Sequence, residues 1–538
     1  MLGIKGLLVS AMLVTALLAC LSGCGDDGDG GPAGPEAGRG DAGGVEDAGD
    51  AEAGTAPDAG SGFAVDCAAL EQAVDERWGD APSVETRLEH FDNLWAYIGS
   101  TYTGFATLPS LDWDEVRNTY RPEFESAESY GRLFTLTTQL MHLVQDVHTV
   151  IWSKRVCDTP RSERPPTFAR YDYPWVASES GSFGVCGTPL DDDRLLVYHV
   201  EPDNPAGLKP GDLILGYDGV PWRELATALQ ACDIPTCGYH RATAAADDRL
   251  LMSAVMFNAH LFERLDVQRY GSAEVESIPT DDLLSLDSTL ECAEQIAPDG
   301  VDLPWTDFEA TPDADWVSWG RLDRNIGYID VFGWSTAAAG LFDSAVAELM
   351  DTEGLVIDMR DHSGGGPTVS DGTAMLFGED VPNLLRRYTR PPDSDYDVVE
   401  LSPLSPVSVV ADPDTFYDRP IAVLTGPKTQ SGGEVSSFVY SKHPRARRFG
   451  RATSGDFGGP GLVGQYTPLA GLVDDFVGLW YAKPSVTGSV YFDADGEVML
   501  RSEQTPETEV WFTQDDVAAG RDTVVEAALA WIAEENGG

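Results

Sequence analysis

The fold is organised around one stretch of sequence, Ile421-Ala422-Val423-Leu424-Thr425-Gly426-Pro427-Lys428-Thr429-Gln430-Ser431-Gly432-Gly433-Glu434. Its apolar run, 421–425, predicts a buried strand, and the residues after it predict a short loop and then a helix. Ser431 stands where this helix begins, and the two glycines after it allow a ligand to approach the backbone. Ser431 is either an N-cap supported by Glu434 or a nucleophile at a helix N-terminus, where free N–H groups favour negative charge. Taken alone, the stretch favours the N-cap.

A second strand and loop precede this stretch. Residues 326–331 predict a strand, 337–350 a helix, and 354–360 a buried strand that runs into Asp361-His362-Ser363-Gly364-Gly365-Gly366. Alternating strands and helices indicate a layered α/β core over 316–538, after an acidic connector. Three glycines after a strand either present N–H groups to an oxyanion or form a flexible turn.

Length and charge limit the possible functions. The chain has 538 residues, of which 42% are hydrophobic, so it can form several domains with cores of their own. Its net charge of -54 argues against nucleic acid and against an anionic membrane surface as the partner, because an acidic protein repels phosphate.

The N-terminus predicts export. Lys5 precedes an apolar segment that ends in Leu21-Ser22-Gly23-Cys24, which is typical of a secretory signal. The last four residues resemble the bacterial lipobox, and this resemblance implies a signal peptide over 1–24 with a lipid on Cys24. An ordinary signal peptide cut near the same place is the alternative, and Cys20 is a poorer site. Residues 25–63, rich in Gly, Ala and Asp, predict a disordered tether rather than a calcium site.

The remaining cysteines predict disulfides in an exported protein. They are Cys67, Cys157, Cys186, Cys232, Cys237 and Cys292. Sequence does not determine how they pair, and only Cys232 and Cys237 are close enough to suggest a local pair.

Residues 64–160 predict a helical subdomain that ends at a candidate base. Apolar residues recur at helical spacing from Phe91 to Ile98, and the β-branched and aromatic run 146–152 suggests a strand. His148 therefore lies at a helix-to-strand junction near Asp146. A junction histidine is usually a surface or hydrogen-bonded residue, but neutral imidazole is the side chain best suited to accept a hydroxyl proton near pH 7.

Residues 165–282 contain a second pattern. The segments 182–185, 195–200 and 204–220, which include Asn204-Pro205-Ala206-Gly207-Leu208-Lys209-Pro210-Gly211-Asp212, strongly resemble a PDZ domain. The resemblance implies that Phe183, Gly184 and Val185 offer N–H groups to a peptide C-terminus, which adds a strand to the sheet edge. Residues 232–262 are longer than this pattern expects and suggest an inserted helical segment.

Together these motifs resemble the tail-specific, or carboxy-terminal processing, serine protease family over residues 85–535. The resemblance rests on Asp358-Met359-Arg360 before the glycines, on the stretch around Ser431, and on 447–455. It implies a PDZ domain joined to a crotonase-like α/β protease core, a multidomain α/β and α+β architecture. It implies Ser431 as the nucleophile, and an oxyanion hole formed by the N–H of Ser431 or Gly432 with Gly364 or Gly365.

The chain departs from the serine–lysine branch of that family. The lysine expected after Thr453-Ser454-Gly455 is replaced by Asp456. Lys442 lies about 16 Å along a helix from Ser431 at 1.5 Å per residue, and Lys428 precedes the nucleophile. The chain therefore resembles the tricorn-type branch, whose base is an N-terminal histidine in an Asp-x-His-Thr context, and His148 fits that position.

The tricorn resemblance also implies an orienting glutamate near the C-terminus. Its motif is degraded here, and Glu503 is the first choice with Glu497 in reserve, although a solvated hairpin carboxylate is the alternative for both. Val147 stands where that branch has a serine, so Asp146 is the candidate for this orienting role. His362 replaces an asparagine common beside the glycine run.

These observations predict a serine endopeptidase of the bacterial cell envelope that acts by acyl transfer on peptide or protein substrates, held to a membrane by its lipid. No metal or organic cofactor is expected, because the sequence has no His-Glu-x-x-His or paired Cys-x-x-Cys motif. The alternatives are a catalytically silent peptide- or lipid-binding protein on the same fold and an envelope scaffold that acts through its PDZ groove alone.

Overall fold

The computed structural model describes residues 65–157, 166–170, 183–285, 292–298, 301, 316–389, 402–412, 414–460, 476–477 and 486–537. All of them belong to the unit formed by residues 63–538. Within these ranges, every helix is too short or too polar to cross a membrane. The predicted lipidation site Cys24 and the linker 25–63 lie outside the described residues.

The N-terminal region is helical and consists mainly of α2 (Cys67–Trp78), α3 (Val84–Thr101), α4 (Trp113–Ser126) and α5 (Tyr130–His142). Phe91 and Leu94 of α3 pack in one core with Leu133 and Phe134 of α5. The chain leaves α5 as a loop, and the strand expected over 146–152 is limited to β1 (Trp152–Ser153). His148 therefore lies in a loop rather than directly before a strand.

The 165–282 region contains an antiparallel sheet in the order β3-β4-β5-β8-β9. Its strands are β3 (Val185–Pro189), β4 (Leu195–Val200), β5 (Leu213–Tyr217), β8 (Arg264–Gln268) and β9 (Val275–Pro279). Between β5 and β8 lie α7 (Trp222–Gln230), α8 (Ala244–Ser253) and a 3-10 helix (Ala254–Leu261). The last two occupy the inserted segment expected over 232–262.

The 316–538 region is built on a sheet in the order β10-β11-β12-β16-β17-β21. Only β10 is antiparallel to its neighbour, and the sheet comprises β10 (Val317–Leu322), β11 (Ile326–Val331), β12 (Gly354–Asp358), β16 (Ile421–Thr425), β17 (Ala446–Gly450) and β21 (Thr508–Glu509). A second sheet pairs β13 (Val381–Thr389) with β20 (Thr487–Asp493), and β20 with β18 (Gly458–Pro460).

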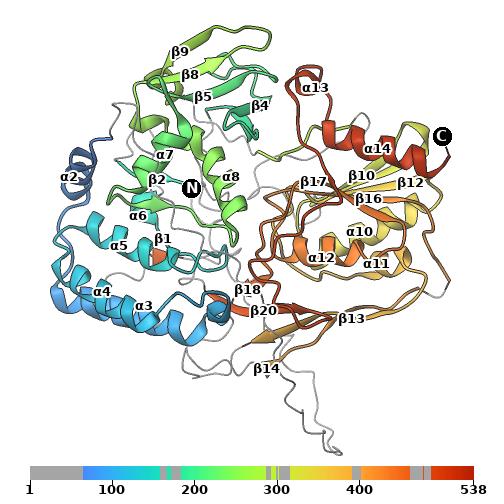
Figure 1. The fold of residues 1–538 in the computed structure, drawn as a ribbon, viewed down its shortest axis with the longest axis horizontal. Helices are drawn as coiled ribbons and strands as arrows, with labels where there is room; N and C mark the ends of the chain where they lie inside the picture. The colour runs from blue at the N-terminus through green and yellow to red at the C-terminus, as the bar shows by residue number, and fades with distance from the viewer. Residues whose placement is uncertain are drawn as a thin grey trace, which may run out of the picture. The chain divides into compact units, whose positions relative to one another are not determined.

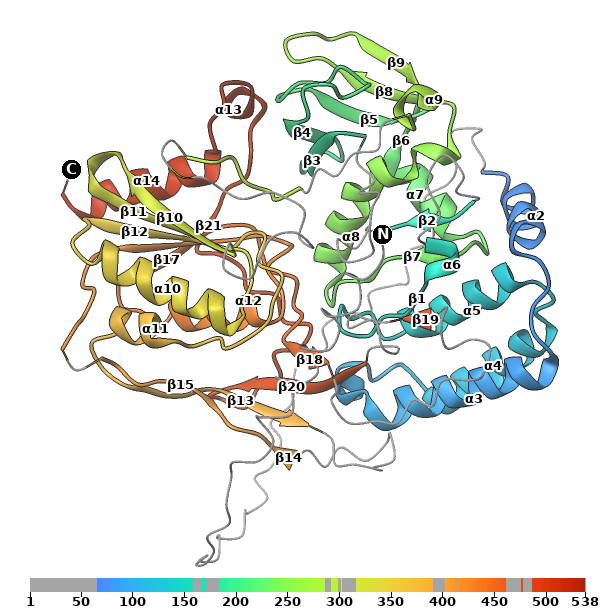
Figure 2. The same ribbon diagram turned by 180° about the vertical axis from the view of Figure 1, so that it is seen from behind.

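Helices cover both faces of the parallel sheet. Ile357 and Val423 point to the face that packs on α10 (Thr336–Leu349) and α12 (Gly432–Tyr440). Val356 and Leu424, one residue away on each strand, point to the face that packs on α14 (Thr523–Glu535). Figures 1 and 2 show α14 on one side of the sheet and α10 and α12 on the other. Because both faces are buried, 354–358 and 421–425 read as continuous apolar runs.

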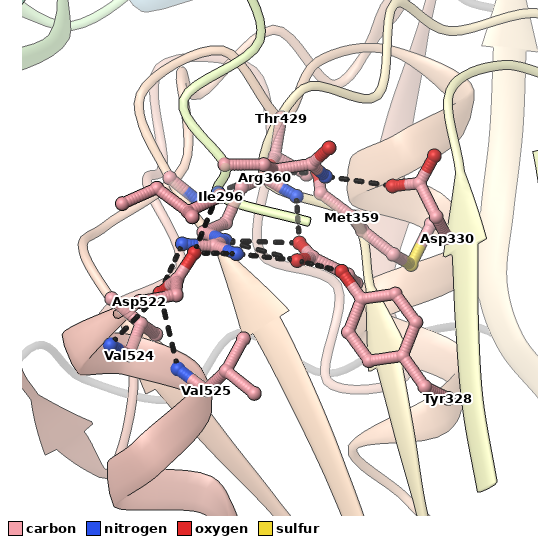
Figure 3. Close-up of polar contacts among 12 residues, drawn as sticks. Ile296, Tyr328, Asp330, Met359, Arg360, Thr429, Asp522, Val524 and Val525 are labelled. Carbon is pink, nitrogen blue, oxygen red and sulfur yellow. Dashed lines mark hydrogen bonds and ion pairs between the residues drawn. The ribbon is translucent and has the colours of Figure 1, made fainter. Parts of the chain in front are cut away.

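A buried ionic network fixes the end of β12 (Figure 3). The Arg360 guanidinium donates to Asp358, with Nε 3.0 Å from Oδ1, and to Asp522, with Nη1 3.0 Å from Oδ1. Asp522 also accepts from the N–H groups of Val524 and Val525 and so caps α14. Both Arg360 and Asp358 are fully buried. The chain therefore enters the loop 361–366 from a fixed point.

The disulfides join Cys67 to Cys232, Cys157 to Cys237, and Cys186 to Cys292. The expected local pair of Cys232 and Cys237 is wrong, because each of these cysteines bonds instead to the N-terminal helical region. The bonds span 165, 80 and 106 residues. Long closed loops of this kind restrict the unfolded chain most.

Candidate active site

Ser431 occupies a strained turn between β16 and α12. Its backbone has φ 53° and ψ -119°, and its side chain makes no capping hydrogen bond to α12. A positive φ is uncommon for a residue other than glycine and persists only where the surrounding structure imposes it. The N-cap interpretation is therefore wrong. The parallel strands β12 and β16 both end at this edge of the sheet, where ligands bind in open α/β sheets.

The imidazole of His148 lies against this serine. Nε2 of His148 is 3.0 Å from Oγ of Ser431, although the two residues are 283 positions apart. His148 is 4% exposed, whereas Ser431 is half-buried. At this distance an unprotonated Nε2 accepts the hydroxyl proton directly, which is the geometry required of a general base.

Asp146 lies on the other side of the imidazole. Its Oδ1 is 3.5 Å from Nδ1 of His148 and accepts the backbone N–H of His148 at 2.8 Å. Burial opposes ionisation of Asp146, but the contact with His148 and the nearby charge of Arg501 hold the pKa of this carboxyl below its usual range. An ionised Asp146 favours the tautomer with its proton on Nδ1, which leaves Nε2 free to accept. Asp146, the alternative candidate for the orienting role, thus lies beside the imidazole, but within the described residues no hydrogen bond joins its carboxylate to Nδ1 of His148.

Glu503 does not contact this pair. Its Oε2 accepts a hydrogen bond from Oγ1 of Thr243 at 3.1 Å, and the structure gives it no contact with Ser431 or His148. The reserve candidate, Glu497, is exposed. The same segment contributes Arg501 instead, whose Nη2 is 3.0 Å from the Tyr102 hydroxyl. The structure therefore does not place the expected orienting glutamate at this pair, and sequence reasoning did not identify Arg501.

The glycine loop holds two of its peptide groups against Trp334. The Gly364 carbonyl accepts the Trp334 N–H at 2.7 Å, and the Gly366 N–H donates to the Trp334 carbonyl at 3.2 Å. In a trans peptide the C=O and the following N–H point in opposite directions. The Gly365 N–H therefore points away from Trp334. The Gly364 N–H donates to Nδ1 of His362 at 2.9 Å, so Gly364 is not available as an oxyanion donor.

The Gly365 and Gly432 backbones meet beside Ser431. A Cβ on Gly432 would lie 2.2 Å from the Gly365 carbonyl oxygen, and a Cβ on Gly364 would lie 3.2 Å from Oγ of Ser431. Among the described residues, neither the Gly365 N–H nor the Gly432 N–H has an acceptor. These two N–H groups are the donors that could stabilise an oxyanion next to Ser431.

His362 supports the glycine loop and is not a second base. It is fully buried, and burial lowers its pKa to about 3, so the ring is neutral. Because its Nδ1 accepts the Gly364 N–H, its proton is on Nε2. The ring also lies 2.7 Å from where a Cβ on Gly433 would be. His362, which stands where an asparagine is common beside the glycine run, therefore fixes the geometry of this loop.

Neither candidate lysine contacts the serine. Nζ of Lys428 donates to the Cys292 carbonyl at 2.6 Å and lies 3.4 Å from Asp361. Nζ of Lys442 lies 4.1 Å from the centre of the Phe438 ring. Within the described ranges, no cluster of three or more His, Cys, Asp or Glu side chains could hold a metal ion.

The expected peptide-binding loop is covered. Phe183, Gly184 and Val185 are buried, and so is every residue of the edge strand β3. The Cys186–Cys292 disulfide brings Cys292 to this edge, where its Sγ lies 3.8 Å from the Val185 carbonyl oxygen. In this conformation a peptide cannot add a strand at Val185, which corrects the expectation of an open edge.

Replacing Gly432 by alanine tests the close approach of the two glycines. We expect the rate of serine labelling by a fluorophosphonate to fall about 10²- to 10³-fold, because the new Cβ displaces the Gly365 peptide. Gly340→Ala is the matched control, since Gly340 is an exposed glycine inside α10 with no atom within 4 Å of its Cβ position. Equal labelling rates in the two variants, with both folded by circular dichroism, would contradict this oxyanion site.

Comparison with known proteins identifies the domain. Residues 325–500 match the model of peptidase family S41, and no curated protein matches the chain. The solved structure of mature CPAF matches with a TM-score of 0.56 and 13% identity, covering 84% of this chain and 96% of that one. The structure of mature CPAF complexed with lactacystin matches with a TM-score of 0.55 and 12% identity, covering 84% of this chain and 98% of that one. The fold is therefore shared with CPAF, and the chain carries a peptidase family S41 domain; it is a serine peptidase.

Proposed function

We propose that this serine peptidase cleaves peptide bonds with Ser431 as nucleophile, His148 as general base and Asp146 as the residue that orients the imidazole. The single observation that carries the proposal is the 3.0 Å separation between His148 Nε2 and Ser431 Oγ. These residues come from two different regions of the chain, and both act on one hydroxyl. A serine held at φ 53° without a capping bond has no evident structural purpose in that conformation.

The reaction is acyl transfer in two stages. Ser431 Oγ bonds to the substrate carbonyl carbon while its proton moves to His148 Nε2, and the N–H groups of Gly365 and Gly432 stabilise the oxyanion. The C–N bond then breaks, and His148 returns the proton to the departing amine. Water, deprotonated by His148, attacks the acyl-enzyme, and Ser431 regains its proton as the acid product leaves.

The cellular setting is inferred from the N-terminal sequence. We infer that the chain is lipidated at Cys24 and held outside the cytoplasm on a bacterial membrane, with residues 25–63 as the tether. We infer that its substrates are then peptides or proteins of the envelope, and that they do not bind along β3, because the Cys186–Cys292 disulfide covers this edge. The three long-range disulfides support an oxidising compartment.

Labelling by a fluorophosphonate tests the proposal directly. Such a probe phosphonylates a serine only when a base activates it, so we expect one labelled site in the purified, folded chain. Mass spectrometry of the peptides should place the label on Ser431. A folded chain that takes up no label would favour the rival function, a catalytically silent binding protein on the same fold. That rival is suggested by Glu503, which bonds to Thr243 and is given no contact with the pair.

A further inference from the structure

Ser431 and His148 are carried by separate regions, and the turn 453–456 lies between them. This turn is attached to the nucleophile helix through Glu434, which is fully buried in α12. Oε1 of Glu434 accepts from Oγ1 of Thr453 at 2.6 Å and from the Gly455 N–H at 2.7 Å. The capping partner expected in Glu434 is thus a fixed link from the Ser431 helix to the turn.

Asp456 extends this link to the His148 loop. Its Oδ1 accepts the backbone N–H of Val147, the residue before His148, at 3.3 Å. Its Oδ2 lies 3.8 Å from Nη1 of Arg241, which comes from the segment before α8. The backbone of Gly458, two residues after Asp456, is also close to the imidazole, since a Cβ on Gly458 would lie 3.5 Å from His148 Nδ1. Asp456 is fully buried at this point.

We propose that Asp456 is a positioning residue for the reaction: it fixes the His148 loop to the Ser431 helix and adds a second negative charge that stabilises the imidazolium. Arg241 orients the Asp456 carboxylate, so the 165–282 region contributes a residue to the site. The inference rests on the proposed function. The other charged groups around His148 are Asp146 on its own loop and Arg501 after β20, with Glu434 behind Asp456.

The position of Asp456 is costly for folding, which argues against a purely structural role. Burial raises the pKa of Asp456 to about 6, although Arg241 opposes the shift. A carboxyl with a raised pKa in the folded state stabilises the fold only at low pH, and this contribution is lost as the pH rises through the folded pKa. An asparagine of the same shape avoids that loss, so the carboxylate destabilises the protein at neutral pH.

The test compares Asp456→Asn with the wild type. Asparagine still accepts the Val147 N–H but carries no charge. We expect fluorophosphonate labelling and kcat on a peptide substrate to fall about tenfold with KM unchanged, and the acid limb of the pH profile to move down by about one unit. The melting temperature of Asp456→Asn relative to the wild type should rise between about pH 4 and pH 7. If Asp456 had a purely structural role, its substitution would lower activity only by lowering the stability of the protein.

Two further variants make the outcome decisive. Asp456→Ala also removes the hydrogen bond to Val147 and should lose activity beyond the asparagine variant, and Asp495→Asn, an exposed carboxylate, is the charge-matched control. Unchanged kcat and acid limb in Asp456→Asn, with the wild type labelled at Ser431, would overturn this inference alone. A folded wild type without label would overturn both the inference and the proposed function.

Discussion

A Ser431→Ala variant is expected to lose peptide hydrolysis by at least about 10⁴-fold, with binding of a slowly cleaved peptide retained. The residual rate would come from the oxyanion donors, which this substitution leaves in place. The hydroxyl makes no capping bond in α12, so its removal should not weaken the helix. The measurement is kcat/KM on a fluorogenic peptide together with the melting temperature, which should stay near that of the wild type.

The matched control is Ser344→Ala. Ser344 is exposed on α10, where its hydroxyl donates only to the Gly340 carbonyl at 2.9 Å. This variant should hydrolyse peptides at the wild-type rate. If Ser431→Ala keeps more than about a tenth of the activity while remaining folded, Ser431 is not the nucleophile.

The pairing of Ser431 with His148 could be predicted from sequence, but the residues that support it could not. Taken alone, the local pattern Ser-x-x-Glu favours an N-cap, and the backbone of Ser431, at φ 53° and without a capping hydrogen bond, excludes that interpretation. Glu434 has the spacing of a capping partner, yet its side chain turns to Thr453 and Gly455. The role of Glu434 depends on tertiary contacts with the turn 453–456. Short-range sequence patterns contain no information about such contacts.

The supporting carboxylates show the same limit. The sequence makes Asp146 a candidate because it is two residues from His148, whereas it shows Asp456 only as the substitute for a lysine. The motif around Glu503 suggested an orienting residue, but the bond to Thr243 depends on the segment inserted before α8. The disulfides likewise follow spatial proximity: Cys232 and Cys237 are near each other in sequence, yet they bond to Cys67 and Cys157.

The sequence predicts the glycine run as an oxyanion site, but it does not predict which glycine N–H is free to donate to an oxyanion. Gly364 donates to His362, and this leaves Gly365 as the donor that faces away from Trp334. Sequence alone could not separate adjacent glycines, because the difference lies in which peptide plane pairs with Trp334. The buried network of Arg360, Asp358 and Asp522 fixes the start of the loop, and within it Arg360 and Asp522 are 162 positions apart.

Replacing His148 by alanine is expected to lower kcat/KM by about 10³- to 10⁴-fold and to slow fluorophosphonate labelling to a similar degree. The effect on the rate is large because the serine hydroxyl is then deprotonated only by water, while Asp146 is left buried without its charged partner during the reaction. The loop should keep its conformation, because the hydrogen bond from the backbone N–H of residue 148 to Asp146 does not depend on the imidazole ring. Melting curves check this expectation.

The form of the pH dependence separates a base from a residue that only packs beside Ser431. In the His148→Ala variant the residual rate should rise with hydroxide concentration, because hydroxide then takes the place of the base, whereas substitution of a residue that only packs beside Ser431 should leave the shape of the wild-type pH profile unchanged. His199→Gln is the control, since His199 lies on β4 and should leave both rate and profile unchanged. If the pH profile of His148→Ala kept the shape of the wild-type profile, another group would be the base, and the assignment of His148 would then be wrong.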